Sequence, residues 1–383
     1  MKIYYWSPFF TNIATIKAVI RSAEALVKFS REGKYNISLI DAIGEWDEYK
    51  KSINKKINII KLSKIKLINH LPKNSFIKSR LSYIIIFFWN FFKLKKLVNN
   101  DKPDFLLIHL MTSLPIFLSL FLDRNTKIIL RISGLPKVNF IRHFFWKIFS
   151  KRIFKVTCPT KSTYDYMLKK KIFEKEKIEI LSDPIIDLKE YRSKKNEKIN
   201  FEKLKNKKYI IGIGRLTKQK NFELMINFFK EISNIHPYLN LVIIGEGENK
   251  TKLKKLSINL GVEKRIYFLG YQKNVFKYLA RAECFILTSL WEDPGFVLAE
   301  AALTGVPIIS SECPNGPKEI IQNNGFLFKN NDLEDLLIKF RDFLDTNEKD
   351  IYKNKLILKK RVKKFTLLEH YKKLNKIIDI NTS

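Results

Sequence analysis

Cysteine, glycine and proline are scarce in this chain of 383 residues, and their scarcity excludes several classes of protein. The three cysteines, Cys158, Cys284 and Cys313, stand at unrelated spacings. This excludes a disulfide scaffold and a paired-cysteine zinc site, and it favours a reducing cytoplasm. With 13 glycines, 12 prolines and 45% hydrophobic residues, the chain is neither disordered, collagen-like nor of low complexity. Its length predicts two or three domains, each able to bury a core.

Acidic residues are also few: 38 Asp and Glu stand against 72 Lys and Arg, which gives a formal net charge of +34. Such a charge suits a partner that is a polyanion, whether nucleic acid, anionic lipid or a phosphorylated small molecule. The chain is rich in Ile, Asn and Phe as well, and the codon bias of an AT-rich genome explains the same composition. Charge alone therefore does not select the partner.

Long uninterrupted apolar runs are lacking. The segment from Phe105 to Leu122 comes nearest, but its 18 residues lie at the lower limit for a membrane span and are interrupted at Met111-Thr112-Ser113 and Pro115. We expect a buried strand, a loop and a buried helix there. The N-terminus, MKIYYWSPFF, has no sustained apolar core and no small-residue cleavage site, so we do not expect a signal peptide.

Two stretches resemble surface anchors. The first, 139–155, predicts a helix with a basic stripe of residues four apart, flanked by apolar side chains; the stripe is His143, Lys147, Lys151 and Lys155, and the flanks are Phe140, Phe144, Phe145, Trp146, Ile148 and Phe149. The second, 76–98, has a short apolar run closed by Lys93, Lys95 and Lys96. We expect both to lie in the headgroup region of an anionic membrane. The alternative is a helix packed on its own sheet, with its lysines in water.

Short apolar runs alternate with helical segments along the chain, which is typical of parallel sheets covered by helices. The first half contains five candidate strands: 3–6, 37–40, 105–110, 127–132 and 156–159. The second half contains five more: 209–213, 241–244, 266–269, 284–288 and 306–310. The polar segment 188–208 between them predicts a linker. We therefore expect two doubly wound α/β domains. Ligands of such sheets bind at the carboxyl ends of the strands.

Glycine-rich turns follow two of the strands in the second half. Gly212-x-Gly214 ends one strand and is followed by Arg215 and Lys220, two cations suited to a diphosphate. A solvated basic loop would explain the same residues. Gly245-x-Gly247 lacks the third glycine of the dinucleotide fingerprint, because Lys250 stands there, so we expect a plain strand-to-helix turn.

The segment 284–310 carries the strongest chemical signal. A strand leads through a loop into the helix FVLAEAAL, 296–303, which is apolar on every face except at Glu300. We expect this helix, and Glu300 with it, to be buried. An isolated buried carboxylate costs several kcal/mol unless it is compensated, so a ligand with hydroxyl groups is an attractive partner. The N–H groups of Gly295, Phe296 and Val297 offer a phosphate site at the helix start.

These residues resemble the retaining glycosyltransferases of family 4, which have the GT-B fold. The resemblance rests on Glu292-x7-Glu300, on the preceding Arg215 and Lys220, and on 308–310 through 316–320, in family order. It implies an α/β GT-B protein with two doubly wound Rossmann-like domains facing a central cleft. We expect an acceptor-side domain at 1–187, a linker at 188–208, a donor-side domain at 209–355, and a C-terminal helix within 356–383 that packs back on the first domain.

The resemblance also implies roles for individual residues. Glu300 would hold the ribose hydroxyls, Glu292 the donor sugar, and Arg215 and Lys220 the diphosphate. His109, at the end of the strand FLLIHL, matches the family's histidine beside the donor sugar, although a core histidine would also fit there. We thus expect His109, Glu292, Arg215 and Lys220 in catalysis. Donor binding would use these cations together with Gly214, Gly270, Pro294, Gly295, Phe296, Val297 and Glu300.

The first half departs from the family pattern, because Ser7-Pro8-Phe9-Phe10-Thr11-Asn12 replaces a Gly-Gly loop after the first strand. The other histidines, His70, His143, His236 and His370, join no constellation and are interpreted as structural.

Our leading hypothesis is an enzyme that moves a sugar from a nucleotide donor, UDP-linked, to a lipid-linked glycan with retention of configuration, in bacterial surface polysaccharide or lipopolysaccharide synthesis. It would be cytoplasmic and peripheral on the inner face of the cell membrane, would need neither a metal nor a cofactor, and would not bind nucleic acid. One alternative is a soluble GT-B enzyme acting on a free sugar or glucan. A basic nucleic-acid-binding protein is the other; it would bind DNA or RNA tightly and in a salt-sensitive way.

Overall fold

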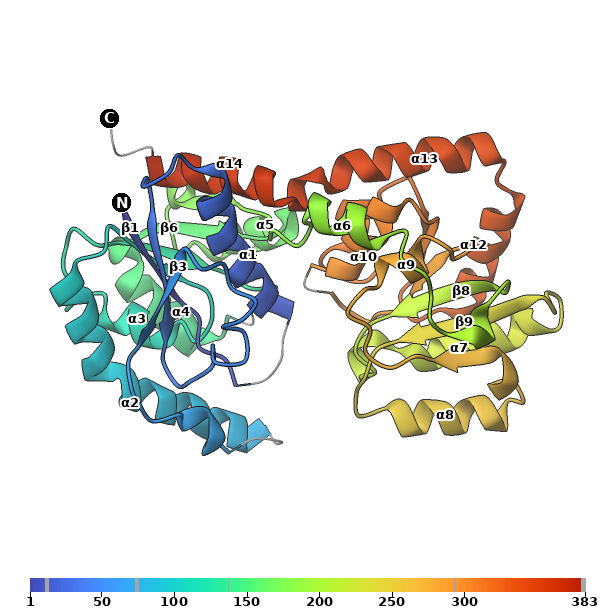
Figure 1. Ribbon diagram of the computed structural model, residues 1–383, viewed down its shortest axis with the longest axis horizontal. Coiled ribbons are helices and arrows are strands. Elements are labelled where there is room, and N and C mark those ends of the chain that lie inside the picture. Colours follow the sequence, from blue (N-terminus) through green and yellow to red (C-terminus); the bar gives the residue numbers. More distant parts are fainter. Residues whose placement is uncertain (11–13, 73–75, 137, 293, 380–383) are drawn as a thin grey trace. The chain divides into compact units, whose positions relative to one another are not determined.

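The computed structural model describes residues 1–10, 14–72, 76–136, 138–292 and 294–379. The chain forms two compact units (Figure 1), each described here by itself: unit 1 comprises Met1–Ile185 and Leu367–Ser383, and unit 2 comprises Ile186–Thr366. Thr11 and Asn12 of the loop after the first strand, Asp293, and the last four residues lie outside the described residues. In the described part of the chain, no helix combines the length and the apolarity that are needed to cross a membrane.

Unit 1 is a seven-stranded parallel sheet in the order β3-β2-β1-β4-β5-β6-β7, covered by helices. Its strands are β1 (Lys2–Trp6), β2 (Asn36–Asp41), β3 (Ile57–Lys61), β4 (Phe105–Ile108), β5 (Lys127–Arg131), β6 (Ile153–Cys158) and β7 (Ile178–Ile180). Its helices are α1 (Ala14–Phe29), α2 (Phe76–Asp101), α3 (Ser113–Leu118), α4 (Phe140–Phe149), α5 (Lys161–Lys170) and α14 (Leu367–Asp379), with short 3₁₀ turns η1 (Leu67–Asn69), η2 (Ser150–Arg152) and η3 (Lys175–Lys177).

The alternation of side chains along each strand divides the core of unit 1 into two layers. Ile3 and Tyr5 of β1 pack with α1 and α14, whereas Tyr4 and Trp6 pack with α2, α3 and α4. Both layers are apolar because a parallel sheet is covered on both faces. Figure 1 shows α14, the last helix of the chain, beside α1.

Two expectations for unit 1 can be compared directly with the structure. The segment from Phe105 to Leu122 forms β4, a loop and the buried helix α3, as predicted. The prediction of one basic helical stripe along 139–155 is wrong in part. The helix α4 ends at Phe149, so Lys151 lies in η2 and Lys155 lies in β6. Trp146 and Phe149 are buried against the sheet, so they are not among the exposed aromatic side chains of this helix.

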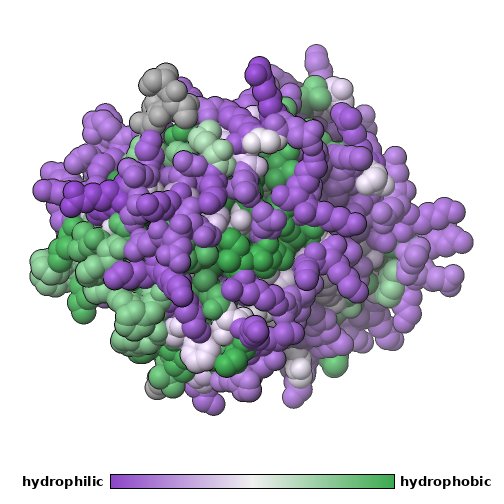
Figure 2. All heavy atoms as spheres, turned by 60° about the vertical axis from the view of Figure 1, so that its left-hand side comes forward, coloured by the Kyte–Doolittle hydropathy of each residue, from purple (hydrophilic) through white to green (hydrophobic). Residues whose placement is uncertain are grey.

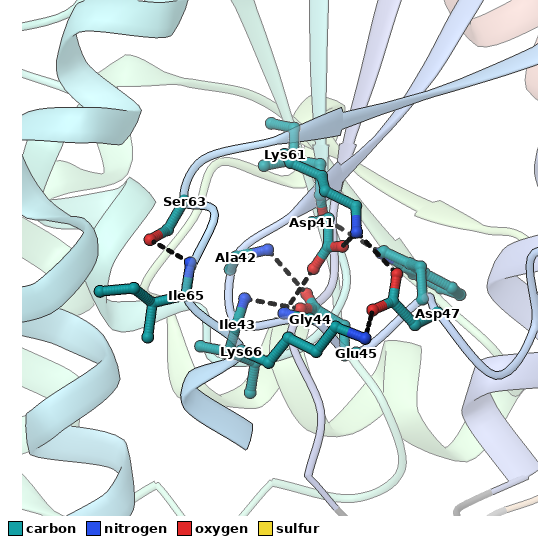
Figure 3. A network of polar contacts seen from close by, with 12 residues as sticks. Asp41, Ala42, Ile43, Gly44, Glu45, Asp47, Lys61, Ser63, Ile65 and Lys66 are labelled. Atoms are coloured by element: carbon teal, nitrogen blue, oxygen red, sulfur yellow. Dashed lines mark hydrogen bonds and ion pairs between the residues drawn. The ribbon is translucent and has the colours of Figure 1, made fainter. Parts of the chain in front are cut away.

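A network of polar contacts fixes the loops that follow β2 and β3 (Figure 3). Both oxygens of the buried Glu45 carboxyl accept backbone N–H groups, at 3.1 and 2.7 Å. Burial, reinforced by a hydrogen bond with Asp41, raises the pKa of Glu45 well above its ordinary value. Asp47 bridges Lys61 and Lys66 at 2.7 and 2.8 Å, and these two lysines lower its pKa. The network therefore ties together the carboxyl ends of two neighbouring strands, which are paired in register.

Unit 2 is a six-stranded parallel sheet in the order β10-β9-β8-β11-β12-β13. Its strands are β8 (Lys208–Ile213), β9 (Leu239–Ile244), β10 (Ile266–Phe268), β11 (Phe285–Leu287), β12 (Ile308–Ser311) and β13 (Phe326–Phe328). Its helices are α6 (Leu188–Lys194), α7 (Phe222–Ser233), α8 (Lys250–Asn259), α9 (Phe276–Leu279), α10 (Phe296–Thr304), α11 (Pro317–Ile321), α12 (Leu333–Asp345) and α13 (Glu348–Arg361), with 3₁₀ turns η4 (Glu202–Leu204), η5 (Lys218–Lys220), η6 (Glu263–Arg265) and η7 (Val362–Phe365).

The unit boundaries differ from those expected from the sequence. The polar segment 188–208 forms α6 and η4 within unit 2, where Asn274 donates to the carbonyl of Lys194 at 2.9 Å and to Glu197 at 2.8 Å. The chain returns to unit 1 after Thr366 rather than near residue 356, because α13 and η7 still pack on α10. The polar composition of 188–208 predicted where the chain passes from unit 1 to unit 2, but it did not predict that α6 forms there.

Candidate functional site

The candidate residues of unit 2 gather at the carboxyl ends of its parallel strands. Gly214, Arg215 and Lys220 follow β8, Gly270 follows β10, and Glu292 with the start of α10 follows β11. β8 is the point at which the strand order reverses, since β9 lies on one side of it and β11 on the other. In open α/β sheets, ligands bind beyond the carboxyl ends of the strands at such a point.

Close packing at the end of β8 explains its glycines. A Cβ at Gly212 would lie 2.4 Å from the sulfur of Met225, and one at Gly214 would lie 3.2 Å from the side chain of Lys220. Gly245, with φ of +145°, brings the turn after β9 against the carbonyl of Gly214, where a Cβ would come within 1.8 Å. The glycines thus allow the turns after β8 and β9 to pack against each other and allow Lys220 to pack against Gly214. Gly245-x-Gly247 forms a strand-to-helix turn, as the sequence predicts.

Lys220, Glu292 and Ser289 form a compact charged cluster. The Lys220 ammonium lies 2.5 Å from Oε1 of Glu292, and the Ser289 hydroxyl donates to the same oxygen at 2.5 Å. The side chains of Lys220 and Glu292 are 13% and 4% exposed. Removing a charge from water is costly, and here the pairing and the hydrogen bond offset that cost. Lys220 is therefore held in one place before any ligand arrives.

Arg215 lies at the edge of this cluster and is exposed. Its guanidinium is 3.4 Å from Oε1 of Gln219, and Gln219 in turn donates to the carbonyl of Trp291 at 2.9 Å. The backbone N–H of Leu290 donates to the carbonyl of Gln219 at 2.8 Å. These bonds join the loop after β8 to the loop after β11. Arg215 and Lys220 therefore lie on the same surface as the loop that carries Glu292.

The start of α10 completes this surface. Gly295 has a φ of +83° and precedes the helix, and among the described side chains none caps it by a hydrogen bond. The first N–H groups of a helix attract anions when no side chain caps them. Pro294 and Val297 are buried and Phe296 is half-buried. A Cβ at Gly316 would lie 2.2 Å from the carbonyl of Pro294, so the loop after β12 supports this turn.

The expectation that Glu300 is buried is wrong. Most of α10 is buried, but Glu300 is only half-buried. The buried acid of this region is Glu292, at 3% exposure. The apolar composition of α10 predicts that the helix as a whole is buried. It does not predict the exposure of a single long side chain, which can extend toward solvent.

Gly270 follows β10, two strands away from β8 in the sheet. Its φ is +65°, its carbonyl accepts the N–H of Gly245 at 2.8 Å, and a Cβ there would lie 2.7 Å from Glu246. Tyr271, the next residue, is 78% exposed. This turn therefore presents an aromatic ring at the same end of the sheet as the two cations.

His109 belongs to unit 1 and is 5% exposed at the end of β4. Its ring stacks on Tyr5, with centroids 5.6 Å apart, and its Nδ1 has no hydrogen-bond partner among the described residues. Burial, together with the nearby charges of Arg131 and His370, lowers its pKa well below the ordinary value. The imidazole is therefore neutral at physiological pH.

Sequence reasoning missed the partners that position these groups. Ser289 and Gln219 carry no motif, and only their hydrogen bonds reveal them. Cys313 also lies close to Glu292 and Lys220, but burial raises its pKa to about 11, so it remains a thiol. Within the described ranges, no group of three or more His, Cys, Asp and Glu side chains is placed to hold a metal ion.

The fold is that of the GT-B glycosyltransferases, with two Rossmann-like α/β units. The crystal structure of Anabaena HepE in complex with UDP matches 99% of this chain and 100% of its own, with a TM-score of 0.74 and 13% identity. A glycosyltransferase from Rickettsia africae matches 100% of this chain and 99% of its own, with a TM-score of 0.73 and 16% identity.

Residues 193–363 match the family described as "Glycosyl transferases group 1", a segment that lies within unit 2 and includes the Lys220 and Glu292 cluster. An uncharacterized glycosyltransferase of Methanocaldococcus jannaschii is 29% identical over 256 residues, which cover 60% of this chain and 61% of the relative. A 4-alpha-N-acetylgalactosaminyltransferase of Campylobacter jejuni, named for a diphospho-undecaprenol substrate, is 26% identical over 244 residues, or 61% and 64%. The matched part of this chain thus spans less than two thirds of these curated relatives.

Proposed function

We propose that the protein is a hexosyltransferase that moves a sugar from a UDP-linked donor to a lipid-linked glycan, with retention of configuration and without a metal. The observation that carries the proposal is the Lys220–Glu292 pair, which is held by Ser289 beside Arg215 and the start of α10. This arrangement offers two cations and a helix N-terminus to a diphosphate, and a fixed carboxylate to a sugar hydroxyl.

The leaving group explains why the cations lie there. As the bond between the anomeric carbon and the diphosphate oxygen breaks, negative charge grows on the departing nucleotide. Arg215, Lys220 and the N–H groups of 295–297 would stabilise that charge without reorganising, because they are already in place. Losing one cation should raise the barrier by about 2–4 kcal/mol, as does the loss of one oxyanion donor.

The chemical step that we propose is a displacement on one face of the sugar. The acceptor oxygen bonds to the anomeric carbon on the face from which the nucleotide leaves, and its proton passes to the departing phosphate oxygen. Glu292 orients the sugar, and Glu300 binds the ribose hydroxyls. His109 is kept as a proposed contact to the donor sugar, on the strength of its position at the end of β4.

The names of similar proteins support the choice of donor and acceptor. The structure of Anabaena HepE is described in complex with UDP, and the Campylobacter jejuni relative is named for a lipid-diphosphate-linked substrate. We therefore assign UDP to the donor and a lipid-linked glycan to the acceptor, in synthesis of a bacterial surface polysaccharide or lipopolysaccharide. We place the protein in the cytoplasm, at the inner face of the cell membrane, where its three buried cysteines remain reduced.

A thermal-shift panel of UDP-, GDP- and ADP-linked sugars tests the donor assignment. A donor at about 100 times its Kd should stabilise the protein by about 2.7 kcal/mol, which raises its Tm. We expect this for a UDP-linked sugar and not for the Glu300→Ala/Arg215→Ala variant. A wild-type Tm that no nucleotide sugar changes would show that the site is not a donor site.

The product of the reaction tests the remaining assignments. With an α-linked donor and a lipid-diphosphate-linked acceptor, the anomeric proton coupling of the product should report an α linkage. A β linkage would refute retention while leaving the donor site intact. Transfer to a free glucan, with none to the lipid-linked acceptor, would replace our acceptor assignment with a soluble one.

A further inference from the structure

Two helices of unit 1 carry stripes of large apolar side chains that are open to solvent. Ile84, Phe88 and Phe92 are four residues apart on α2, and Phe140, Phe144 and Ile148 are four apart on α4. We call these six residues the aromatic face. Phe92 is 77% exposed and Phe140 is 84% exposed. Residues spaced by four lie on one side of a helix, so each stripe is continuous.

The two stripes belong to one side of the unit 1 sheet, because α3 joins the helices that carry them. Phe117 of α3 lies with its ring centroid 6.0 Å from Phe87 and 6.1 Å from Phe91 of α2. Phe117 also lies with its ring centroid 5.9 Å from that of Phe149 of α4. The inner sides of α2 and α4 thus pack in one core, while the aromatic face is left outside. Figure 2, in which the unit 1 side of Figure 1 comes forward, shows hydrophobic side chains gathered in patches among hydrophilic ones.

The charge that accompanies the aromatic face has one sign. α2 and α4 together contain seven Lys and Arg residues and a single acid, Asp101, which is the last residue of α2. Lys93 lies with its ammonium 3.9 Å from the centroid of the Trp89 ring, so its aliphatic stem runs along apolar surface. Lys96, beyond the end of the α2 stripe, is exposed.

We propose that the aromatic face docks the protein on a bilayer of anionic lipids. Phe88, Phe92, Phe140 and Phe144 enter the boundary between headgroups and acyl chains, and the lysines and arginines of α2 and α4 contact the headgroups. The inference deepens the proposed function, on which it rests, by naming the surface that brings the protein to a lipid-linked acceptor.

Charge complementarity favours a membrane over a protein as the occupant. An exposed apolar face on two helices with seven cations and one acid matches an interface in which apolar chains lie beneath anionic groups. A second copy of this chain would bring two sets of cations together, which opposes dimerisation through this face. Since no described helix can span a bilayer, the contact is interfacial.

Flotation with lipid vesicles tests the proposal on the full-length protein. Phe88→Ser/Phe144→Ser is compared with Ile235→Ser/Ile258→Ser, a matched pair of exposed apolar positions in unit 2, at 73% and 61% exposure. We expect the wild type and the control to float with phosphatidylcholine vesicles that contain about 30% phosphatidylglycerol. The Phe88→Ser/Phe144→Ser variant should bind at least about tenfold more weakly. Tm values of both variants establish that they fold.

Three results would overturn the proposal: a wild type that does not float, equal flotation of the two variants, or a vesicle-free dimer that only the Phe88→Ser/Phe144→Ser variant abolishes. The nucleotide-sugar thermal shift, measured on the same samples without lipid, separates this failure from failure of the proposed function. If the thermal shift persists while flotation fails, the surface is wrong and the donor site stands. If flotation occurs and no nucleotide sugar binds, the surface stands and the donor site is wrong.

Discussion

At the scale of single residues, the most informative contact joins two side chains 72 positions apart in the chain, Lys220 and Glu292. A buried carboxylate bonded to a serine hydroxyl and a lysine is costly to assemble and rigid once assembled. In the proposed reaction Lys220 meets the diphosphate and Glu292 meets the sugar. Under this proposal, the pair lies where the bond between sugar and phosphate breaks.

The Glu292→Gln variant separates these two roles. Its amide oxygen can still accept from Ser289 and Lys220, so the Lys220 ammonium remains available to phosphate. We expect the Kd for UDP to stay within about threefold of wild type, while kcat for sugar transfer falls about 100-fold, the loss seen on removing one preorganised polar group. Calorimetry with UDP and a radiolabelled transfer assay measure the two quantities.

Glu223→Gln, at an exposed ion pair with Lys252, is the matched control for that variant and should change neither quantity. An unchanged kcat for Glu292→Gln would contradict the role assigned to this carboxylate.

The sequence predicted which of these residues lie together at one end of the unit 2 sheet better than how they contact one another. Arg215, Lys220 and Glu292 stand in a recognisable order, and the structure brings them to one end of one sheet. That Lys220 pairs with Glu292 could not be predicted, because the pairing depends on how two distant loops pack. Glu300 shows a second limit of sequence-based prediction. The apolar composition of its helix predicted that Glu300 is buried, but the exposure of one side chain depends on neighbours that are remote in sequence.

At the scale of elements, the last helix of the chain is part of unit 1. His370 of α14 is buried, its Nε2 is 2.8 Å from the Ser22 hydroxyl of α1, and its Nδ1 is 2.8 Å from the carbonyl of Ser182. Burial lowers the pKa of His370 to about 4, a shift that Arg131 and Lys373 increase and that Asp183 and the Ser182 hydrogen bond oppose. The interpretation of this histidine as structural agrees with these contacts.

The stability of the α14 contact should depend on pH. Because the folded pKa of His370 is about 4 and its ordinary value is 6.5, its contribution is complete above about pH 6.5 and is lost as the pH falls toward 4. The free energy of unfolding should fall by about 3 kcal/mol over this range on account of His370.

A His370→Gln variant can keep both hydrogen bonds and should lose less stability in acid than the wild type. His109, whose pKa is also lowered, adds a dependence of the same sign to both proteins. Urea unfolding at several pH values measures the difference, and parallel pH profiles for the two proteins would contradict it.

Strands were the most predictable elements. Each strand expected from an apolar run is present, within a few residues. The strands β3, β7 and β13 were missed. All three lie at sheet edges, where fewer apolar residues are needed, and β7 and β13 have only three residues each. The helix α6 was read as linker because its residues are polar. Its position depends on Asn274, far along the chain.

At the scale of the whole molecule, the net charge of +34 complicates any test with an anionic ligand. A nucleotide could collect on a basic surface without occupying a site. Specific binding must depend on which cations are present, and general attraction only on how many. A comparison at equal charge separates the two.

The most direct test of the account is therefore the Kd for UDP, measured by calorimetry at physiological salt, for Arg215→Ala/Lys220→Ala and for Lys254→Ala/Lys255→Ala. Both double variants lose two positive charges, and the second pair lies on the exposed face of α8. Since each charge-assisted hydrogen bond contributes about 1.5–3 kcal/mol, the first variant should bind UDP about 100-fold more weakly or worse, and the second should match the wild type. Equal losses in the two variants would mean that UDP is bound by net charge alone, and would contradict a donor site built on Arg215 and Lys220.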